Sequence, residues 1–214
     1  GSAGASVRNI LSTEAVTCLT HDWRGEPGMS SAELIREAVA ATSHLADGVS
    51  PDNRSGRTPC AEFNVGDLLA HVAGFMATSI AAALRSYPAD DADLGDNPRA
   101  TWHVLGSTMA DAWATPDAFE GRTHLGAREM SAFIAGHITL FETLVHGWDL
   151  ATATGQRLEL SNELSETSLV TAQRLCVDRA REAGAFGREV NAPAGGGPFE
   201  QALALAGRDP NWSA

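Results

Sequence analysis

Apolar residues in this chain recur at intervals of three and four in five separate segments. That period is typical of an α-helix with one buried face, because residues i, i+3, i+4 and i+7 lie on the same side of a helix. No segment alternates apolar and polar residues strongly enough to predict a sheet. The sequence therefore predicts an all-α protein in which amphipathic helices pack into a bundle.

Capping residues and glycine or proline breaks delimit the predicted helices. Asn64 is the clearest start signal, because it can cap a helix whose third residue is the acidic Asp67. Ser30 and Ser161 are further candidate N-caps. The predicted helices cover about residues 31–48, 65–87, 99–114, 130–154 and 161–184, and a short apolar piece at 199–205 is expected to dock back on the bundle.

Length and composition predict one domain. With 214 residues, of which 43% are hydrophobic, the chain can bury a sizeable core. We assign residues 29–214 to that domain and interpret residues 1–28 as a tag, a mis-assigned start or a loose arm. The chain has 27 acidic against 15 basic residues, which repels nucleic acid and anionic membrane surfaces. No apolar run is long enough to predict a membrane span.

All 15 basic residues are arginines, so the chain holds no lysine amine. This excludes a Walker-type phosphate loop, a Schiff-base enzyme and a pyridoxal enzyme, since each needs a lysine at the reacting centre. The three cysteines are widely spaced and form no C-x-x-C motif, which favours reduced thiols over a disulfide framework. We therefore expect a cytoplasmic protein.

Glu142 and His146 lie four residues apart in the fourth predicted helix, so their side chains can converge on one point. Chance alone would give about 0.5 such pairs in a chain with these numbers of glutamates and histidines. Both residues lie beside the main apolar stripe, however, where burial without a partner would be costly. The alternative is a charge pair on the surface of the helix.

His71 occupies a comparable apolar face of the second predicted helix. Helical bundles build metal sites from inward-facing ligands on different helices, and two imidazoles with one carboxylate leave an open coordination position. The alternative is a hydrogen-bonded core histidine. Asp149 either orients His146 or is a solvated carboxylate at the helix end. Cys60 precedes the second helix, so its thiol is either activated by the helix terminus or simply buried.

Three segments carry a resemblance to a known family. Residues 58–71 (TPCAEFNVGDLLAH) resemble the entry to the second helix of DinB-like proteins related to mycothiol-dependent maleylpyruvate isomerase. Residues 142–156 (ETLVHGWDLATATGQ) are similar to the signature of that group, and residues 206–210 (AGRDP) resemble its C-terminal tag. The resemblance covers the chain from about residue 29 to the end.

The resemblance implies an up-and-down four-helix bundle with a short C-terminal appendage. It also implies one divalent metal ion held by His71, Glu142 and His146, with zinc first and nickel, manganese or iron as alternatives. The expected chemistry is a mycothiol-dependent S-transfer, in which the metal activates the thiol toward an electrophilic substrate. The catalytic acid or base and the substrate stay unknown. The resemblance to the family also implies a homodimer. The arginine-only composition suits an actinobacterial source.

Two other functions compete with the S-transferase. The same ligands could serve a non-catalytic metal- or ligand-binding sensor, or a hydrolase in which metal-bound water attacks the substrate. Isomerase activity itself is not expected, because the isomerases of the family carry a larger C-terminal domain than the tail that follows the bundle here.

Overall fold

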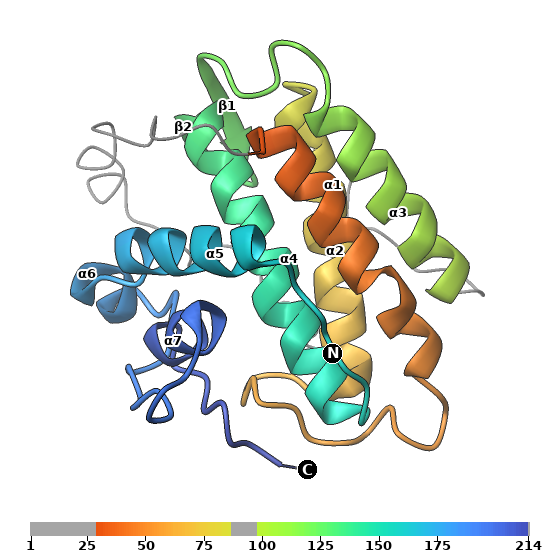
Figure 1. The fold of residues 1–214 in the computed structure, drawn as a ribbon. Helices are drawn as coiled ribbons and strands as arrows, with labels where there is room; N and C mark the ends of the chain where they lie inside the picture. Colours follow the sequence, from red (N-terminus) through yellow and green to blue (C-terminus); the bar gives the residue numbers. More distant parts are fainter. Residues whose placement is uncertain (1–28, 87–97, 214) are drawn as a thin grey trace.

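The computed structural model describes residues 29–86 and 98–213 (Figure 1). Within these ranges the protein has seven α-helices, one 3₁₀ helix and one two-stranded hairpin, so the predicted mostly helical class is confirmed. The elements are α1 (Ser31–Thr42), η3 (Ser43–Gly48), α2 (Val65–Ala83), α3 (Pro98–Trp113), β1 (Arg122–Leu125), β2 (Arg128–Ser131), α4 (Ala132–Ala153), α5 (Asn162–Leu175), α6 (Asp178–Glu182) and α7 (Pro198–Leu205).

The predicted caps start three of these helices. The Asn64 side chain accepts a hydrogen bond from the backbone N–H of Asp67 at the start of α2. Ser30 forms a capping box with Glu33 at the start of α1, and Ser161 caps α5. Each cap satisfies an N–H group that the helix itself leaves without a partner.

Helices α1 to α4 enclose the main core, with α1 and α2 each packed against both α3 and α4. Their order is not strictly up-and-down. The indole N–H of Trp113, the last residue of α3, donates to Ser79 near the end of α2 at 2.8 Å, so α2 and α3 run in the same direction. Arg36 in α1 pairs with Asp111 in α3, which makes α1 antiparallel to α3.

The length of the α2–α3 connection permits this parallel order. About fourteen residues separate the two helices, and an extended chain of that length reaches about 46 Å. Helix α2 is only about 28 Å long at 1.5 Å per residue. A connection of this length is therefore long enough to span α2 from its end back to the level of its start, which a short loop could not do.

The prediction that the chain has no sheet was wrong at one place. Strands β1 and β2 form an antiparallel hairpin, in register from Arg122 opposite Ser131 to Leu125 opposite Arg128. Gly126 adopts a positive φ of 62° in the tight turn between them. Each strand has four residues, which is too short for its alternation of buried and exposed side chains to stand out in the sequence.

The predicted fifth helix is divided in two. Helix α5 ends at Leu175, and α6 begins at Asp178 after the chain leaves helical geometry at Cys176. Helix α5 crosses α4 and packs closely against α7, so the expected C-terminal appendage is a small helical unit (Figure 1). Arg181 ties this unit together by donating to the backbone carbonyls of Cys176, Gly187 and Leu205.

Two further predictions from the sequence concern the N-terminal arm and membrane spans. The expected arm of residues 1–28 lies outside the described residues. Among the described helices, α2 is long and apolar enough to cross a membrane by length and composition, but 56% of that stretch is buried inside the protein. A core helix of a soluble protein passes the same test, so this is weak evidence for a membrane span.

Candidate metal centre

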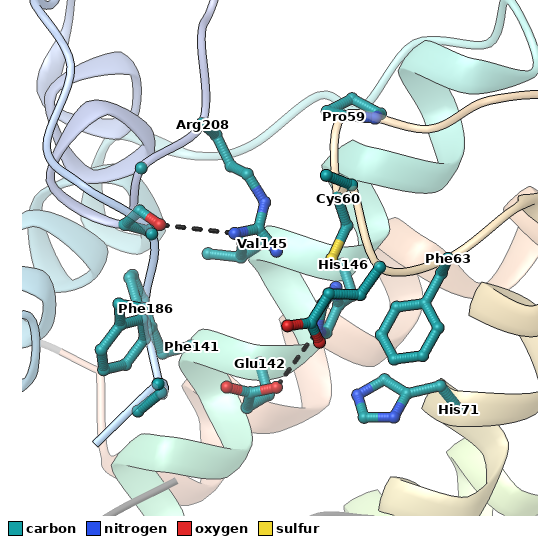
Figure 2. A pocket seen from close by; sticks show the side chains of 17 residues that line it. Pro59, Cys60, Phe63, His71, Phe141, Glu142, Val145, His146, Phe186 and Arg208 are labelled. Carbon is teal, nitrogen blue, oxygen red and sulfur yellow. Dashed lines mark hydrogen bonds and ion pairs between the residues drawn. The ribbon is translucent and has the colours of Figure 1, made fainter. Parts of the chain in front are cut away.

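A pocket of about 360 Å³ lies where three segments of the chain meet (Figure 2). The helical wall of the pocket consists of His71 from α2 and Phe141, Glu142, Val145 and His146 from α4. The C-terminal wall consists of residues 184–187, which follow α6, and residues 206–208, which follow α7. The loop of residues 59–63, just before α2, covers the third side.

His71, Glu142 and His146 converge in the helical wall. One ligand atom from each of the three lies within 4.8 Å of the others, and the Nε2 atom of His146 is 3.3 Å from a carboxylate oxygen of Glu142. Glu142 and His146 are both only 8% exposed, so the alternative of a surface charge pair was wrong. The structure thus brings together all three residues that the sequence proposed as ligands.

Aromatic packing holds His71 in this position. The ring of Phe63, from the loop before α2, stacks on the His71 imidazole with the centroids 4.6 Å apart. The His71 and His146 rings meet edge to face at 5.0 Å. The Phe63 ring therefore packs on one face of the His71 imidazole, and the edge-to-face contact sets the angle between the two histidine rings.

A second set of contacts fixes the orientation of His146. Its Nδ1 atom lies 2.9 Å from the carboxylate of Asp149, which is fully buried. The guanidinium of Arg208 donates to both oxygens of that carboxylate, at 3.0 to 3.2 Å. Of the two alternatives for Asp149, the orienting role is confirmed in geometry. No sequence pattern predicted Arg208 as the partner of Asp149.

Burial and charge shift the pKa values of these groups in opposite directions. Burial, helped by the neighbouring His146, lowers the pKa of His71 to about 4. Burial also disfavours the charged form of His146, but hydrogen bonds and charge from Asp149 and Glu142 outweigh it and raise the His146 pKa to about 9. The metal-free site therefore pairs a neutral imidazole with an imidazolium held between two carboxylates.

The chemistry of these donors fits a divalent metal ion. Neutral imidazole and carboxylate are the forms that ligate, and His71 is already neutral at pH 7. Asp149 accepts from Nδ1 of His146, the outer hydrogen bond that metal-binding histidines generally make. Three protein donors at the wall of an open pocket leave space for a further ligand, as in catalytic rather than structural metal sites.

Cys60 lies in the same pocket, and one of the two alternatives for it was wrong. Burial raises the pKa of its thiol to about 11, so the helix terminus does not activate it in the metal-free protein. Its Sγ atom nevertheless lies within 4.8 Å of ligand atoms of His146 and Asp149. The spacing in the sequence did not connect Cys60 with His146, because 86 residues separate them.

The C-terminal wall of the pocket was not predicted from helix period or residue spacing. Two glycines bring its segments together: Gly207 has a positive φ of 81°, and a Cβ atom there would lie 2.7 Å from the backbone of Gly187. Phe186 from this wall meets Phe141 of α4 edge to face at 6.2 Å. Only the resemblance of residues 206–210 to a family tag pointed to this region.

Together, the helical fold and the two-histidine, one-glutamate cluster define a helical protein with a candidate catalytic metal centre. Residues 35–151 match the family model described as the mycothiol maleylpyruvate isomerase N-terminal domain. The match covers more than half of the chain, and the chain belongs to this family. The match confirms the family resemblance, and it spans the motif at 58–71 and residues 142–151 of the second motif.

Two relatives come from Mycobacterium tuberculosis: the uncharacterized proteins MT0763 of strain CDC 1551 / Oshkosh and Rv0738 of strain H37Rv. Each is 28% identical to this chain over 174 residues, which is 81% of this chain and 94% of the relative. No solved structure matches the chain. The family match ends at residue 151, so the C-terminal wall of the pocket lies beyond it.

Proposed function

We propose that this protein is a metal-dependent thiol S-transferase of the mycothiol-using type, built on a DinB-like four-helix bundle. The observation that carries the proposal is the convergence of His71, Glu142 and His146 at the wall of an open pocket. Family membership supports mycothiol as the thiol. The metal is one divalent ion, with zinc first and nickel, manganese or iron as alternatives.

The residues of the site have distinct roles in this proposal. His71 supplies a neutral nitrogen donor, and Glu142 supplies an anionic oxygen. Asp149 holds His146 by its Nδ1 atom, which leaves Nε2 directed toward Glu142. Arg208 neutralises the buried Asp149 and so keeps that carboxylate from turning toward the cation.

A divalent ion bound there would stabilise a thiolate over a thiol, and so supply a nucleophile at neutral pH. The pocket volume of about 360 Å³ is in the range of small-molecule sites, which favours an enzyme over a purely structural metal site. Val145, Phe141 and Phe186 give the pocket an apolar side that can exclude water from the reacting groups. A cytoplasmic location and a homodimer are parts of the same proposal.

Metal analysis and turnover together test the proposal. We expect about one divalent ion per chain in the wild-type protein, and loss of that ion in His71→Ala and Glu142→Gln. The metal-loaded protein should couple mycothiol to a neutral haloarene electrophile, with thioether formation followed by absorbance. Failure of the wild type to bind zinc, nickel or manganese would overturn the proposal. Metal binding with ester hydrolysis that needs no thiol would favour the hydrolase instead.

A further inference from the structure

One side of the pocket is an aromatic surface that stands apart from the three candidate donors. Phe141 of α4 and Phe186, from the segment between α6 and α7, meet edge to face, and both line the pocket together with Val145. Figure 2 shows these two rings on one side of Glu142 and His71 on the other side. Phe141 is buried, whereas Phe186 is only partly buried against the core. A molecule in the pocket can therefore contact the Phe186 ring beside the donors.

Small residues keep the space around Phe186 open. The neighbours of Phe186 in the pocket lining are all glycine or alanine: Gly184, Ala185, Gly187, Ala206 and Gly207. The pocket volume of about 360 Å³ is at the lower end of the range for small-molecule sites, which is about 300–1,000 Å³. Because the reacting end of the thiol must share this volume, the remaining space suits a single ring better than a fused ring system.

The charges around the pocket favour a neutral molecule over an anion. Arg208 is the one arginine among the described residues that line the pocket, and all three of its guanidinium nitrogens donate to Asp149 or to the Ala206 carbonyl. Glu142 and the substrate thiolate together would balance the charge of a divalent ion, and Glu62 adds an exposed carboxylate to the lining. An anionic electrophile would thus meet an excess of negative charge, which repels it.

We propose that the electrophilic substrate is a small, neutral molecule with one aromatic ring, and that this ring packs against Phe186 and Phe141. Its role as the electrophile rests on the proposed function, but the binding of the ring to this surface needs neither metal nor thiol. Aromatic rings gain from offset-stacked and edge-to-face contacts beyond the burial of apolar area. Phe186 is therefore the residue that determines specificity for the electrophile, because its ring is the more accessible of the two.

Binding of an unreactive ring to the metal-free protein tests this surface without turnover. Dinitrobenzene has no leaving group, and dinitrobenzoate is the same ring with a carboxylate. In NMR titrations we expect dinitrobenzene to bind about tenfold or more tightly than dinitrobenzoate, because of the excess negative charge. Phe186→Ala should weaken dinitrobenzene binding about five- to tenfold, and Phe186→Leu should weaken it less, because leucine keeps apolar area but loses the ring.

Phe199→Ala is the matched control for the Phe186 variants. Phe199 is also partly buried in the C-terminal unit but does not line the pocket, so this variant should bind dinitrobenzene as the wild type does. Equal or tighter binding of dinitrobenzoate by the wild type would overturn the neutral class of substrate. Unchanged dinitrobenzene binding in Phe186→Ala would overturn the aromatic surface. Nuclear Overhauser contacts between bound dinitrobenzene and Phe186 in the wild type decide the same question if Phe186→Ala does not fold, and their absence would overturn it.

Turnover separates this inference from the proposed function. With chlorodinitrobenzene, the mycothiol sulfur attacks the ring carbon that carries chlorine, a C–S bond forms, and chloride leaves with the electron pair of the C–Cl bond. In the metal-loaded protein, Phe186→Ala should raise KM for this substrate more than it lowers kcat. Dinitrobenzene binding at Phe186 without thioether formation would overturn the proposed function and leave the aromatic surface standing. Thioether formation that is equally efficient with the carboxylate analogue would overturn this inference and leave the proposed function standing.

Discussion

The helical wall and the C-terminal wall of the pocket are built by different means. In the helical wall, Glu142 and His146 lie one turn apart on α4 and meet His71 from α2, so regular helix spacing positions the side chains. In the C-terminal wall, backbone contacts dominate: Gly187 packs directly against Gly207, and Arg181 holds three carbonyl oxygens.

The two walls also differ in which part of the chain supplies them. The candidate metal donors lie inside the region that matches the family, whereas the C-terminal wall lies beyond it. Apart from Phe186 and Arg208, the C-terminal wall consists of glycine and alanine residues, so small shifts of its turns can change its shape without moving the donors. We infer that the helical wall carries the chemistry and the C-terminal wall shapes the space for the substrate. One ion pair, Asp149 with Arg208, joins the two.

The largest expected effect is the loss of metal binding when a donor of the helical wall is removed. His71→Ala should weaken zinc binding by more than about 100-fold, because two remaining donors cannot hold the ion against water. Titration calorimetry on the metal-free protein measures this. His103→Ala, which removes an exposed histidine paired with Asp47, is the control and should bind as the wild type does. An equal loss of zinc affinity in His103→Ala would show that the effect comes from unfolding of the protein and not from loss of a donor.

Breaking the ion pair between Asp149 and Arg208 should lower the stability of the fold and should affect both walls. Asp149→Asn leaves Arg208 buried with an unpaired charge, for which we expect about 3–5 kcal/mol of lost stability. Denaturant unfolding measures the change. The double variant Asp149→Asn with Arg208→Met removes the stranded charge and should recover part of the loss. If the double variant is as unstable as the single one, the pair is not what joins the walls.

The free energy of unfolding of the metal-free protein should depend on pH in two separate ranges, one set by His146 and one by His71. The His146 pKa rises from 6.5 to about 9 on folding, so its contribution to stability is present below about pH 6.5 and lost toward pH 9. The His71 pKa falls from 6.5 to about 4, so stability is lost as the pH drops from 6.5 toward 4. Unfolding free energies from pH 4 to 9 measure both slopes.

Replacing each histidine with asparagine tests these assignments. His146→Asn should flatten the alkaline slope, and His71→Asn should reduce the acid one. Zinc affinity should rise about tenfold per pH unit up to about pH 9, because the ion competes with the proton on His146. A zinc affinity that does not change between pH 6 and 9 would contradict the imidazolium in the metal-free site.

Loosening the C-terminal wall should leave the metal donors in place. Arg181→Ala removes three hydrogen bonds from a charged donor to backbone carbonyls, for which we expect about 2–3 kcal/mol of lost stability. Hydrogen exchange should accelerate at residues 184–187 and 203–208, while zinc affinity changes by less than about fivefold. A large loss of zinc affinity would show that the two walls are not independent.

The smallest effect should come from a site outside both walls. Gly155 ends α4 with a positive φ of 69°, and no atom lies within 4 Å of where its Cβ would be. Gly155→Ala should therefore cost about 1 kcal/mol, through backbone strain alone. Thermal unfolding measures this, and metal content should stay at the wild-type value. A change in metal content would show that the substitution at the end of α4 also displaces His146.

Sequence patterns predicted the features that depend on local spacing. The caps at Asn64 and Ser161 were right because a cap needs only the residues of the first helical turn. The pairing of Glu142 with His146 was right because one turn of helix brings them together. The hairpin and the division of the fifth helix were missed because each depends on a few residues whose local preference is weak.

The sequence by itself determined a mostly helical chain, the helix starts and the three candidate donors, since these follow from helix period and from the chemistry of the side chains. Only the tertiary structure decided that α2 and α3 run parallel, that Arg208 meets Asp149, and that Cys60 faces His146. These contacts join residues between 34 and 86 positions apart. Such pairs are set by how the helices pack and how the loops return, and no local spacing encodes them.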